Sequence, residues 1–460
     1  MLANPAVRRS SSRPLSTRIS RGLLCAAVLS AAALGGTPAS AQNVLPNPNE
    51  LRAAGLELAW WAVAAVPAGR GQVEFLSADE NAVYVQTNDN LLTAINLTSG
   101  AKKWAIRVGR DGQTAVRVAT APPVEAGPGG ESSPGLVLAC VGRTAYGIHQ
   151  DTGETMWELP LPQAAVAAPT IGDTEEGRRL FVPSVTGSVY SFDMRTIEEF
   201  RLEKRLQEFA TGTQRWRYET GSPLIGGVVV EGIAAVFANV RGVLYGVDAE
   251  KRELLWRFET DGRATAPIAA GDGVVYLASS DRNLYAVDTT NGLDRWEFVS
   301  QEPVEVKPAV VEGALYVTPG RGGVSRVDRD TGRAIWRAER TTEFLAQAGG
   351  RAYASDFADN VVALDLATGR RIGSVRMDRF PVRMQNSLTD RVIVSTKTGI
   401  VLCLKAAGSG FPVYYAHPER RPVEPSFADD APAEEAPTDA PAEEAPADAP
   451  AAGAAAVNEN

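Results

Sequence analysis

The chain has 460 residues, of which 44% are apolar and 22% are charged, as is typical of globular proteins. The formal net charge is −9, and about ten of the acidic residues lie from Glu424 onward, where no Lys or Arg occurs. The body of the chain is therefore only mildly acidic. It lacks the basic stripe that nucleic-acid binding requires, so we expect no nucleic-acid partner.

The N-terminus has the pattern of an export signal. Five arginines precede an apolar run at 22–36, and Ala39 and Ala41 form a small-x-small cleavage site before Gln42. The apolar run is too short to span a bilayer stably, so we expect no transmembrane helix after signal cleavage. Cys25 follows Gly-Leu-Leu, a poor context for a lipid anchor. We therefore expect an exported protein of the periplasm or cell envelope.

Two further cysteines, Cys140 and Cys403, follow the signal, and both lie in strand-like runs. We expect two buried free thiols. A single disulfide is the alternative in an oxidising compartment, because spacing alone does not decide between the two.

From Gln72 onward one motif recurs about every 40 residues, a period typical of four-stranded propeller blades. Each unit alternates apolar and polar residues, makes a turn, and closes on a tryptophan eight positions after the turn residue. The tryptophans at this position are Trp104, Trp157, Trp256, Trp296 and Trp336, with Trp216 reached after an insertion. The pattern predicts an all-β propeller of eight blades, with seven as the alternative.

The turn and the tryptophan have a physical explanation. A carboxylate at the turn can accept backbone N–H groups, and glycine can adopt a positive φ. The indole can then pack against the neighbouring blade, with its N–H needing one acceptor. We expect these residues to dock blades rather than to catalyse. The aspartates at the turn position are Asp248, Asp288, Asp328 and Asp365.

The last unit lacks an outer strand. Its strands are expected at 382–385, 392–395 and 400–404, and no fourth strand follows them. The run Leu56–Val63 near the start of the chain, which carries Trp60 and Trp61, has no blade of its own. We expect it to complete the last blade, because that closes the ring and removes both free edges.

The predicted order of segments follows from these patterns. It is a signal peptide (1–41), a lead-in (42–54), the propeller (55–405), a C-terminal extension (406–423) and an acidic Ala/Pro/Glu tail (424–460). We expect the tail to be disordered, because it has almost no core-forming residues.

The sequences DRDTGRAIW, DTTNGLDRW and HQDTGETMW resemble the tryptophan-docking motif of PQQ-like β-propeller repeats. The resemblance covers roughly residues 72–404. Such repeats occur in quinoprotein alcohol dehydrogenases and in the BamB-type lipoproteins of outer-membrane assembly. The resemblance therefore implies a propeller that serves either as a catalyst or as a scaffold.

Features of the catalytic relatives are missing from the sequence. The resemblance implies PQQ, calcium, a catalytic Asp and a disulfide of adjacent cysteines, but this chain has no adjacent cysteines and no c-type haem attachment sequence. It also has only two histidines, His149 and His417, which disfavours a His-based triad or metal site. We expect a non-enzymatic scaffold without a cofactor or metal. The alternatives are a divergent PQQ-binding oxidoreductase or sensor, and a carbohydrate- or peptide-binding propeller.

Two departures from the repeat are candidate binding surfaces for a protein partner of the cell envelope. The insertion at 195–210 is expected to be a helix whose apolar residues either pack on the propeller rim or dock the partner. Those apolar residues are Ile197, Phe200, Leu206 and Phe209. Arginines also stand at successive turns between the second and third strands, where they are either solvated or receive an acidic ligand. They are Arg143, Arg241, Arg282 and Arg321. We expect the protein to be a monomer.

Overall fold

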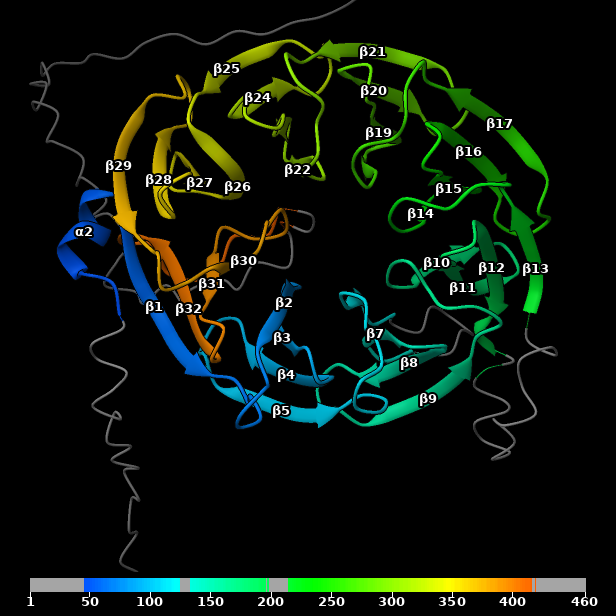
Figure 1. Ribbon diagram of the computed structural model, residues 1–460, viewed down its shortest axis with the longest axis horizontal. Coiled ribbons are helices and arrows are strands. Elements are labelled where there is room, and N and C mark those ends of the chain that lie inside the picture. Colours follow the sequence, from blue (N-terminus) through cyan, green and yellow to red (C-terminus); the bar gives the residue numbers. More distant parts are fainter. Residues whose placement is uncertain (1–44, 125–132, 196, 198–213, 416–417, 419–460) are drawn as a thin grey trace, which may run out of the picture. The chain divides into compact units, whose positions relative to one another are not determined.

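Eight four-stranded antiparallel sheets are arranged around a common axis as a β-propeller (Figure 1). The computed structural model describes residues 45–124, 133–195, 197, 214–415 and 418. The prediction of eight blades is confirmed. In seven blades the strands follow one another in sequence from the inside to the outside.

The first four blades are formed by consecutive strands. Blade 1 holds β2 (Val73–Ala78), β3 (Ala82–Thr87), β4 (Leu91–Asn96) and β5 (Lys102–Arg107), and blade 2 holds β6 (Ala119–Ala121), β7 (Leu136–Val141), β8 (Thr144–His149) and β9 (Thr155–Pro160). Blade 3 holds β10 (Thr170–Thr174), β11 (Gly177–Pro183), β12 (Ser188–Asp193) and β13 (Gln214–Glu219), and blade 4 holds β14 (Val229–Glu231), β15 (Ala234–Ala238), β16 (Val243–Asp248) and β17 (Leu254–Glu259).

The next three blades repeat this order. Blade 5 holds β18 (Ala269–Gly271), β19 (Val274–Ala278), β20 (Asn283–Asp288) and β21 (Asp294–Val299), and blade 6 holds β22 (Ala309–Val311), β23 (Ala314–Val317), β24 (Val324–Asp328) and β25 (Ala334–Ala338). Blade 7 holds β26 (Thr341–Ala348), β27 (Arg351–Asp356), β28 (Asn360–Asp365) and β29 (Arg371–Arg376).

The eighth blade joins the two ends of the propeller. It contains β30 (Val382–Arg383), β31 (Val392–Ser395) and β32 (Ile400–Ala406), and its outer strand is β1 (Leu56–Val63). Strand β1 is antiparallel to β32, with Leu56 opposite Ala406 and Val63 opposite Ile400. Figure 1 shows β1 in blue beside the orange β32. The closing-strand prediction is therefore confirmed.

Inner strands are shorter than the sequence pattern predicts: the one expected at 382–385 in the last blade ends at Arg383. In blade 5 the strand-like pattern runs from Thr265 to Ala270, but β18 begins only at Ala269. Pro267 lies just before it and has no N–H for a ladder hydrogen bond. Ala264 forms only an isolated bridge with Ser279. The alternating pattern thus extends further along the chain than the regular strand does.

Trp60 places the closing strand in the hydrophobic core. It is 7% exposed and packs in one cluster with Val83 and Ile95 of blade 1 and Ile393 of blade 8. Its indole Nε1 donates to the Leu97 carbonyl at 2.7 Å. Trp60 therefore makes for blade 8 the contact that the repeat tryptophans make for other blades. The next residue, Trp61, is only half-buried.

A short helix fills the place of the tryptophan that blade 7 lacks. Helix α2 (Pro48–Ala53) begins after Asn47, whose side chain accepts the Asn49 N–H. The helix lies beside β29 (Figure 1). A Cβ added at Gly373 of β29 would stand 2.8 Å from the Ala54 Cα. Glycine at this position thus makes room for the end of the helix.

Cys140 and Cys403 are free and buried. Cys140 lies on β7 and Cys403 on β32, in different parts of the core. Burial raises the pKa of each thiol to about 12. The expectation of two buried free thiols is confirmed, and the disulfide alternative is wrong for this structure.

No helix within the described part of the chain is both long and apolar enough to cross a membrane. The predicted signal peptide lies outside the described residues, and so does the acidic tail.

We expect Trp60→Ala to lower the free energy of unfolding by about 3–5 kcal/mol, because it removes a buried aromatic ring at the seam of the propeller. Trp61→Ala is the matched control on the same strand, and should lower it by less than about 2 kcal/mol. Guanidinium titrations followed by fluorescence would measure both. Equal losses for the two variants would contradict the role of Trp60 in ring closure.

We expect Cys140 and Cys403 to resist a maleimide reagent at pH 8 while the protein is folded, because burial excludes the reagent and holds both thiols protonated. Both should react completely once guanidinium unfolds the chain. Mass spectrometry of the labelled peptides would check this, with the unfolded sample as the control for reagent activity. Labelling of either cysteine in the folded protein would show that its blade opens locally.

Candidate functional site

Six of the eight junctions between neighbouring blades share one type of hydrogen bond, which a tryptophan makes. The indole Nε1 of one blade donates to a backbone carbonyl in the turn that precedes the outer strand of the following blade. The bonds are Trp60 to Leu97 (2.7 Å), Trp104 to Gln150 (3.0 Å), Trp216 to Ala249 (3.0 Å), Trp256 to Thr289 (2.8 Å), Trp296 to Arg329 (2.9 Å) and Trp336 to Leu366 (2.8 Å). Trp157 is buried in the cluster shared by blades 2 and 3.

The turn glycine lies directly against the tryptophan ring. Gly332 of blade 6 has a φ of +69°, and a Cβ added there would lie 2.5 Å from the Trp296 ring. Gly369 of blade 7 has the same φ of +69° and the same relation to Trp336, at 2.6 Å. Glycine is thus needed at these positions both for the backbone conformation and for the close approach of the indole.

The turn aspartates are engaged in shaping the turns. Asp328 Oδ1 accepts the Thr331 N–H at 2.9 Å and the Thr331 hydroxyl at 2.6 Å. Asp365 makes the same pair of bonds with Thr368, at 2.9 and 2.7 Å. Asp248 accepts two backbone N–H groups, from Glu250 and Lys251. These carboxylates therefore stabilise turns.

Asp288 is held ionised by its neighbours. The Thr290 hydroxyl donates to Asp288, and so does the Arg295 guanidinium, at 2.6 Å. First the hydroxyl and then the guanidinium lower the pKa of Asp288 to about 2. Because the pKa is lower in the folded state, this stabilisation is present at neutral pH and is lost as the pH falls towards 2.

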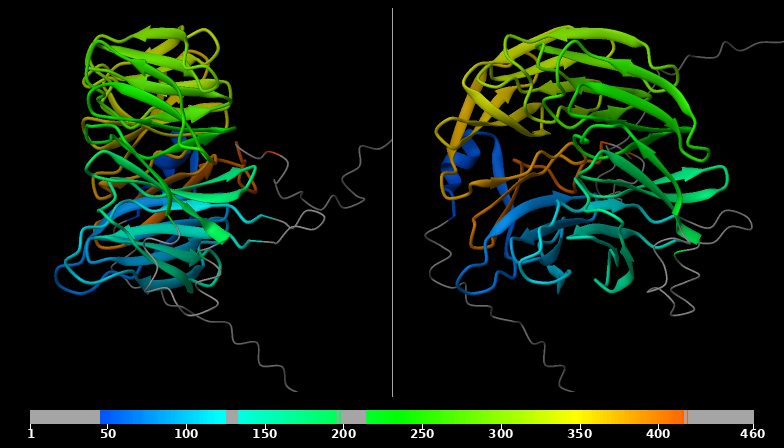
Figure 2. Two further views of the ribbon diagram at one scale, coloured as in Figure 1. Left: turned by 90° about the vertical axis from the view of Figure 1, so that its right-hand side faces the viewer. Right: turned by 45° about the vertical axis from the view of Figure 1, so that its right-hand side comes forward.

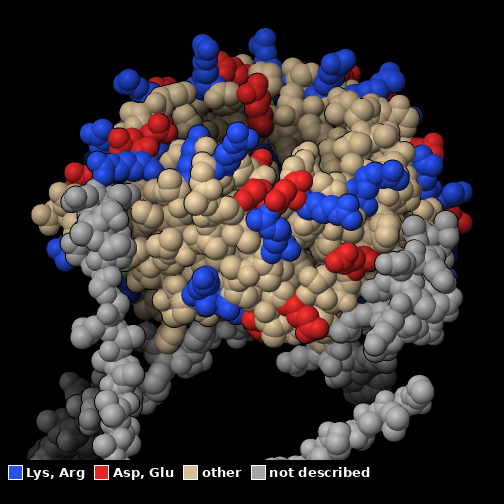
Figure 3. All heavy atoms as spheres, turned by 60° about the horizontal axis from the view of Figure 1, so that its bottom comes forward, with Lys and Arg blue, Asp and Glu red and all other residues tan. Residues whose placement is uncertain are grey.

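The four arginines occupy the predicted turns, and all are exposed. The Arg143 guanidinium donates to the carbonyls of Leu161 and Pro162, which ties it to its own blade. The guanidinium groups of Arg241, Arg282 and Arg321 form no hydrogen bond or ion pair with any described residue. On the face seen in Figure 3, acidic and basic side chains alternate and do not gather by sign.

The insertion that was predicted to be a helix lies almost entirely outside the described residues. Ile197 is described and is fully buried in the core cluster of blades 2 and 3, beside Met194 and Phe192. This side chain packs on the propeller and is not free to contact a partner. Phe200, Leu206 and Phe209 lie outside the described residues.

A hollow of about 530 Å³ lies between blades 3 and 4, and we call it the blade 3–4 groove. Three turns form it, at 173–175, 232–233 and 248–251. Glu250 bridges the two blades by accepting the Glu176 N–H at 2.6 Å. Arg195, the first residue of the insertion, donates to the Glu176 carbonyl. The groove thus lies next to the start of the insertion.

Ile233 is the apolar feature of this groove and is 62% exposed. Carboxylates of Asp173, Glu175 and Glu250 surround it, together with the Lys251 ammonium. No sequence pattern pointed to this surface. The one available signal is local: Ile233 stands at the turn position that Gly273 occupies in blade 5.

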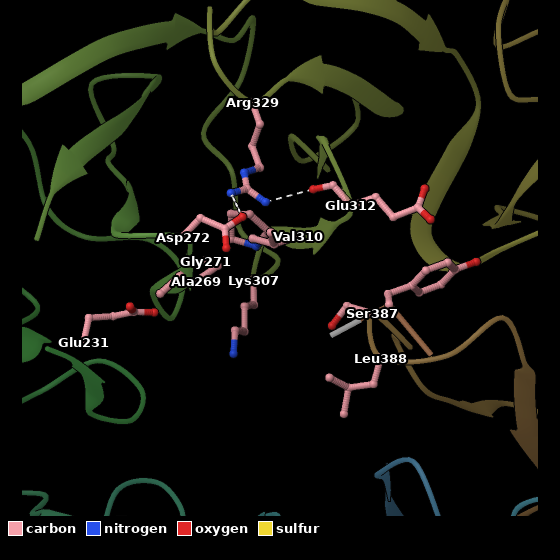
Figure 4. Close-up of a pocket in the computed structure, with 13 residues that line it drawn as sticks. Glu231, Ala269, Gly271, Asp272, Lys307, Val310, Glu312, Arg329, Ser387 and Leu388 are labelled. Atoms are coloured by element: carbon pink, nitrogen blue, oxygen red, sulfur yellow. Dashed lines mark hydrogen bonds and ion pairs between the residues drawn. The ribbon is translucent and has the colours of Figure 1, made fainter. Parts of the chain in front are cut away.

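A second hollow, of about 440 Å³, lies at the inner strands, and we call it the channel pocket (Figure 4). Blades 4, 5 and 6 supply the ends of their inner strands, and Ser387, Leu388 and Tyr415 come from blade 8 and the segment after it. Tyr415 is fixed there by its N–H, which donates to the Leu388 carbonyl at 2.9 Å, and by its hydroxyl, which donates to the Gln347 carbonyl at 2.5 Å. The pocket also contains Lys307.

A buried ion pair holds the segment that ends at Tyr415. Asp390 and Arg391 are 5% and 3% exposed and lie 2.8 Å apart. Arg391 donates to the Gly410 carbonyl, and Asp390 accepts the Val413 N–H.

Among the described residues, no group of three or more His, Cys, Asp or Glu side chains is placed to hold a metal ion.

The chain matches the family model described as outer membrane protein assembly factor BamB over residues 51–201 and 201–410. Solved structures with a similar fold include BamB from Moraxella catarrhalis, at 13% identity and a TM-score of 0.55 over 76% of this chain and 99% of that one. The computationally designed protein Ika8 matches at 13% identity and a TM-score of 0.53, over 74% and 98%. The C-terminal WD40 domain of Sif2 matches at 11% and 0.54, over 77% and 99%. At these identities the structural likeness establishes the fold alone, and no curated protein sequence matches the chain.

We expect Gly332→Ala to destabilise the protein more than Gly350→Ala. Gly350 has a similar φ of +71°, but a Cβ there meets nothing within 4 Å. Gly350→Ala should therefore lower the free energy of unfolding by only about 1–2 kcal/mol, which is the cost of an alanine in the left-handed conformation. Gly332→Ala adds the clash with Trp296, for about 1–3 kcal/mol more.

Denaturant titration of both variants would measure the difference, and the near-ultraviolet circular dichroism of Trp296 should change only in Gly332→Ala. Equal losses of stability in the two variants would show that the clash with the Trp296 indole adds nothing to the cost of the left-handed backbone conformation.

Proposed function

The chain belongs to the family of the outer membrane protein assembly factor BamB, and on that basis we propose that it is a non-enzymatic scaffold of the cell envelope that binds a protein partner in outer-membrane protein assembly. The observation that carries the proposal is the blade 3–4 groove. An exposed isoleucine within a hollow of this size is a feature of docking surfaces, where an apolar centre is surrounded by a polar rim.

The groove favours a partner segment of defined chemistry. Ile233 offers an apolar contact, and Asp173, Glu175 and Glu250 supply negative charge around it. A segment with an apolar side chain flanked by Lys or Arg would complement both features. We therefore propose that the partner presents such a segment to blades 3 and 4.

The position of the groove supports this choice of surface. It adjoins Arg195, where the chain leaves the regular repeat for the insertion between β12 and β13. Insertions in loops carry function more often than the elements they join. The three unpaired arginines of blades 4 to 6 remain a second candidate surface, which would suit an acidic partner instead.

We expect Ile233→Asp to reduce crosslinking of the protein to its main envelope partner by at least about tenfold, because burying an unpaired carboxylate at an interface costs more than about 1.4 kcal/mol. Leu293→Asp is the matched control, since Leu293 is 65% exposed on blade 5, away from the groove. This control should crosslink like the native protein. Circular dichroism would verify that both variants are folded.

Two outcomes would contradict the groove as the docking surface. One is unchanged crosslinking for Ile233→Asp. The other is a loss only in the triple variant Arg241→Glu, Arg282→Glu and Arg321→Glu, which would move the interface to the arginine turns. Stoichiometric binding of added PQQ with calcium, followed by dye reduction with alcohols, would overturn the non-enzymatic assignment itself.

A further inference from the structure

The junction between blades 7 and 8 lacks the indole joint of the repeat. Gly373 stands on β29 where the other outer strands carry a tryptophan, so no indole reaches from blade 7 to blade 8. The end of α2 takes part of this place. The Tyr353 hydroxyl of blade 7 donates to the carbonyls of Ala54 and Gly55, at 3.3 and 3.4 Å. The rest of the junction is held from inside the ring.

A strap formed by residues 407–415 follows β32 and runs beside the loop at 386–391 of its own blade. The two segments are antiparallel, with an isolated bridge between Thr389 and Tyr414. The strap lies inside the ring in Figure 1 and at one face of the ring in the left view of Figure 2. It therefore lies at one end of the channel.

The strap and this part of blade 8 reach across to blades 6 and 7. The Asn386 N–H donates to the Leu345 carbonyl of β26 at 2.7 Å. The Gln385 side chain donates to the Lys307 carbonyl of blade 6 at 3.0 Å. The Tyr415 ring packs on the core cluster that blades 6 and 7 share. Blade 8 is thus fastened to two other blades from inside the ring.

Gln347 of β26 connects the strap to blade 6. Its backbone carbonyl accepts the Tyr415 hydroxyl at 2.5 Å. Its side chain accepts the Tyr316 hydroxyl at 2.7 Å and donates to the Glu312 carboxylate at 3.1 Å. Gln347 is itself buried. The Tyr415 hydroxyl therefore enters a buried polar network that holds it in one position.

The strap can leave without the loss of any blade strand. Residues 407–415 contain no regular strand, and the sheet of blade 8 is complete without them. The strap is held in part by the Asp390–Arg391 pair, whose two side chains are 5% and 3% exposed. Burial of two charges opposes the attachment of the strap, and hydration of the pair favours its release. The apolar joints made by the tryptophans carry no such opposing contribution.

We propose that the strap is a releasable lock of the junction between blades 7 and 8, and that it is the gate of the channel pocket. Tyr415 of the strap lines the pocket together with Ser387 and Leu388 of the adjoining loop (Figure 4). Release of the strap removes this wall and opens the pocket at one face of the ring. The blades stay joined, because β1 still pairs with β32. The blade 3–4 groove has no part in this device.

The test measures how fast reagents of two sizes reach a cysteine introduced into the pocket of the full-length chain. Val310→Cys places a thiol on β22, which lines the pocket. A small methanethiosulfonate should modify it at similar rates with and without Tyr415→Ala. A polyethylene glycol maleimide should react at least about tenfold faster when Tyr415→Ala is present, because the strap is then released. Phe411→Ala, at an exposed position of the same strap, is the matched control and should leave both rates unchanged.

Hydrogen exchange followed by mass spectrometry gives a second measurement that needs no introduced cysteine. In Tyr415→Ala, amides at 386–391 and 409–415 should exchange at least about tenfold faster, while those of β1 and β32 keep their native rates. Tyr415→Phe keeps the ring and loses only the hydrogen bond to Gln347, so it should give intermediate rates. Near-ultraviolet circular dichroism would verify that each variant is folded.

Equal labelling by the large reagent with and without Tyr415→Ala would overturn the gate. Exchange that accelerates equally in β1 and β32 would overturn the lock, because the strap would then be part of ring closure itself. If Tyr415→Ala does not fold, Tyr415→Phe decides the question. Native exchange rates at 386–391 and 409–415 in that variant would overturn the proposal.

Discussion

Closure of the propeller depends on the pairing of β1 with β32, two strands separated by almost the whole of the domain. Each four-stranded blade is a sheet whose edges must be covered. A ring of blades covers these edges only if its first and last blades are joined. The seam has the same kind of joint as the other blades, since Trp60 makes there the hydrogen bond and the glycine contact that the other repeat tryptophans make. Because this pairing has the longest loop to close, it is expected to form late in folding.

The same constraint explains the irregular start of the propeller domain. The chain must place β1 on the outside of blade 8 and then cross to the inside of blade 1. It approaches β1 through α2, which lies over β29. A tryptophan in the usual place on β29 would occupy the volume of α2, and Gly373 leaves that volume open. Helix α2, from the start of the domain, therefore takes the place of the tryptophan that blade 7 lacks.

The fold was predictable because its determinants are local and repeated. Turn carboxylate, glycine and indole lie within nine residues of one another, so spacing alone revealed the joint between blades. Counting strands in the last unit was enough to predict the role of Leu56–Val63. The lengths of the inner strands were harder to predict, because the strand-like pattern before β18 continues through Pro267 while regular pairing does not.

The candidate sites could not be predicted in the same way, because their residues come together only in the folded ring. Lys307 and Tyr415 line one pocket from blade 6 and from the segment after blade 8, and no spacing connects them. The exposure of Ile233 depends on the turns of two blades, and a single apolar residue in a turn is common. Ile197 shows the reverse case: as one of four apolar residues in an insertion it was a candidate for partner contact, yet it is part of the core.

The buried Asp390–Arg391 pair has a consequence for the segment that ends at Tyr415. By fixing the backbone at Gly410 and Val413, it sets the path of the chain towards Tyr415, which lines the channel pocket. Removing either partner would leave an uncompensated buried charge. The wall that Tyr415 gives to the channel pocket therefore depends on an ion pair whose residues do not line the pocket.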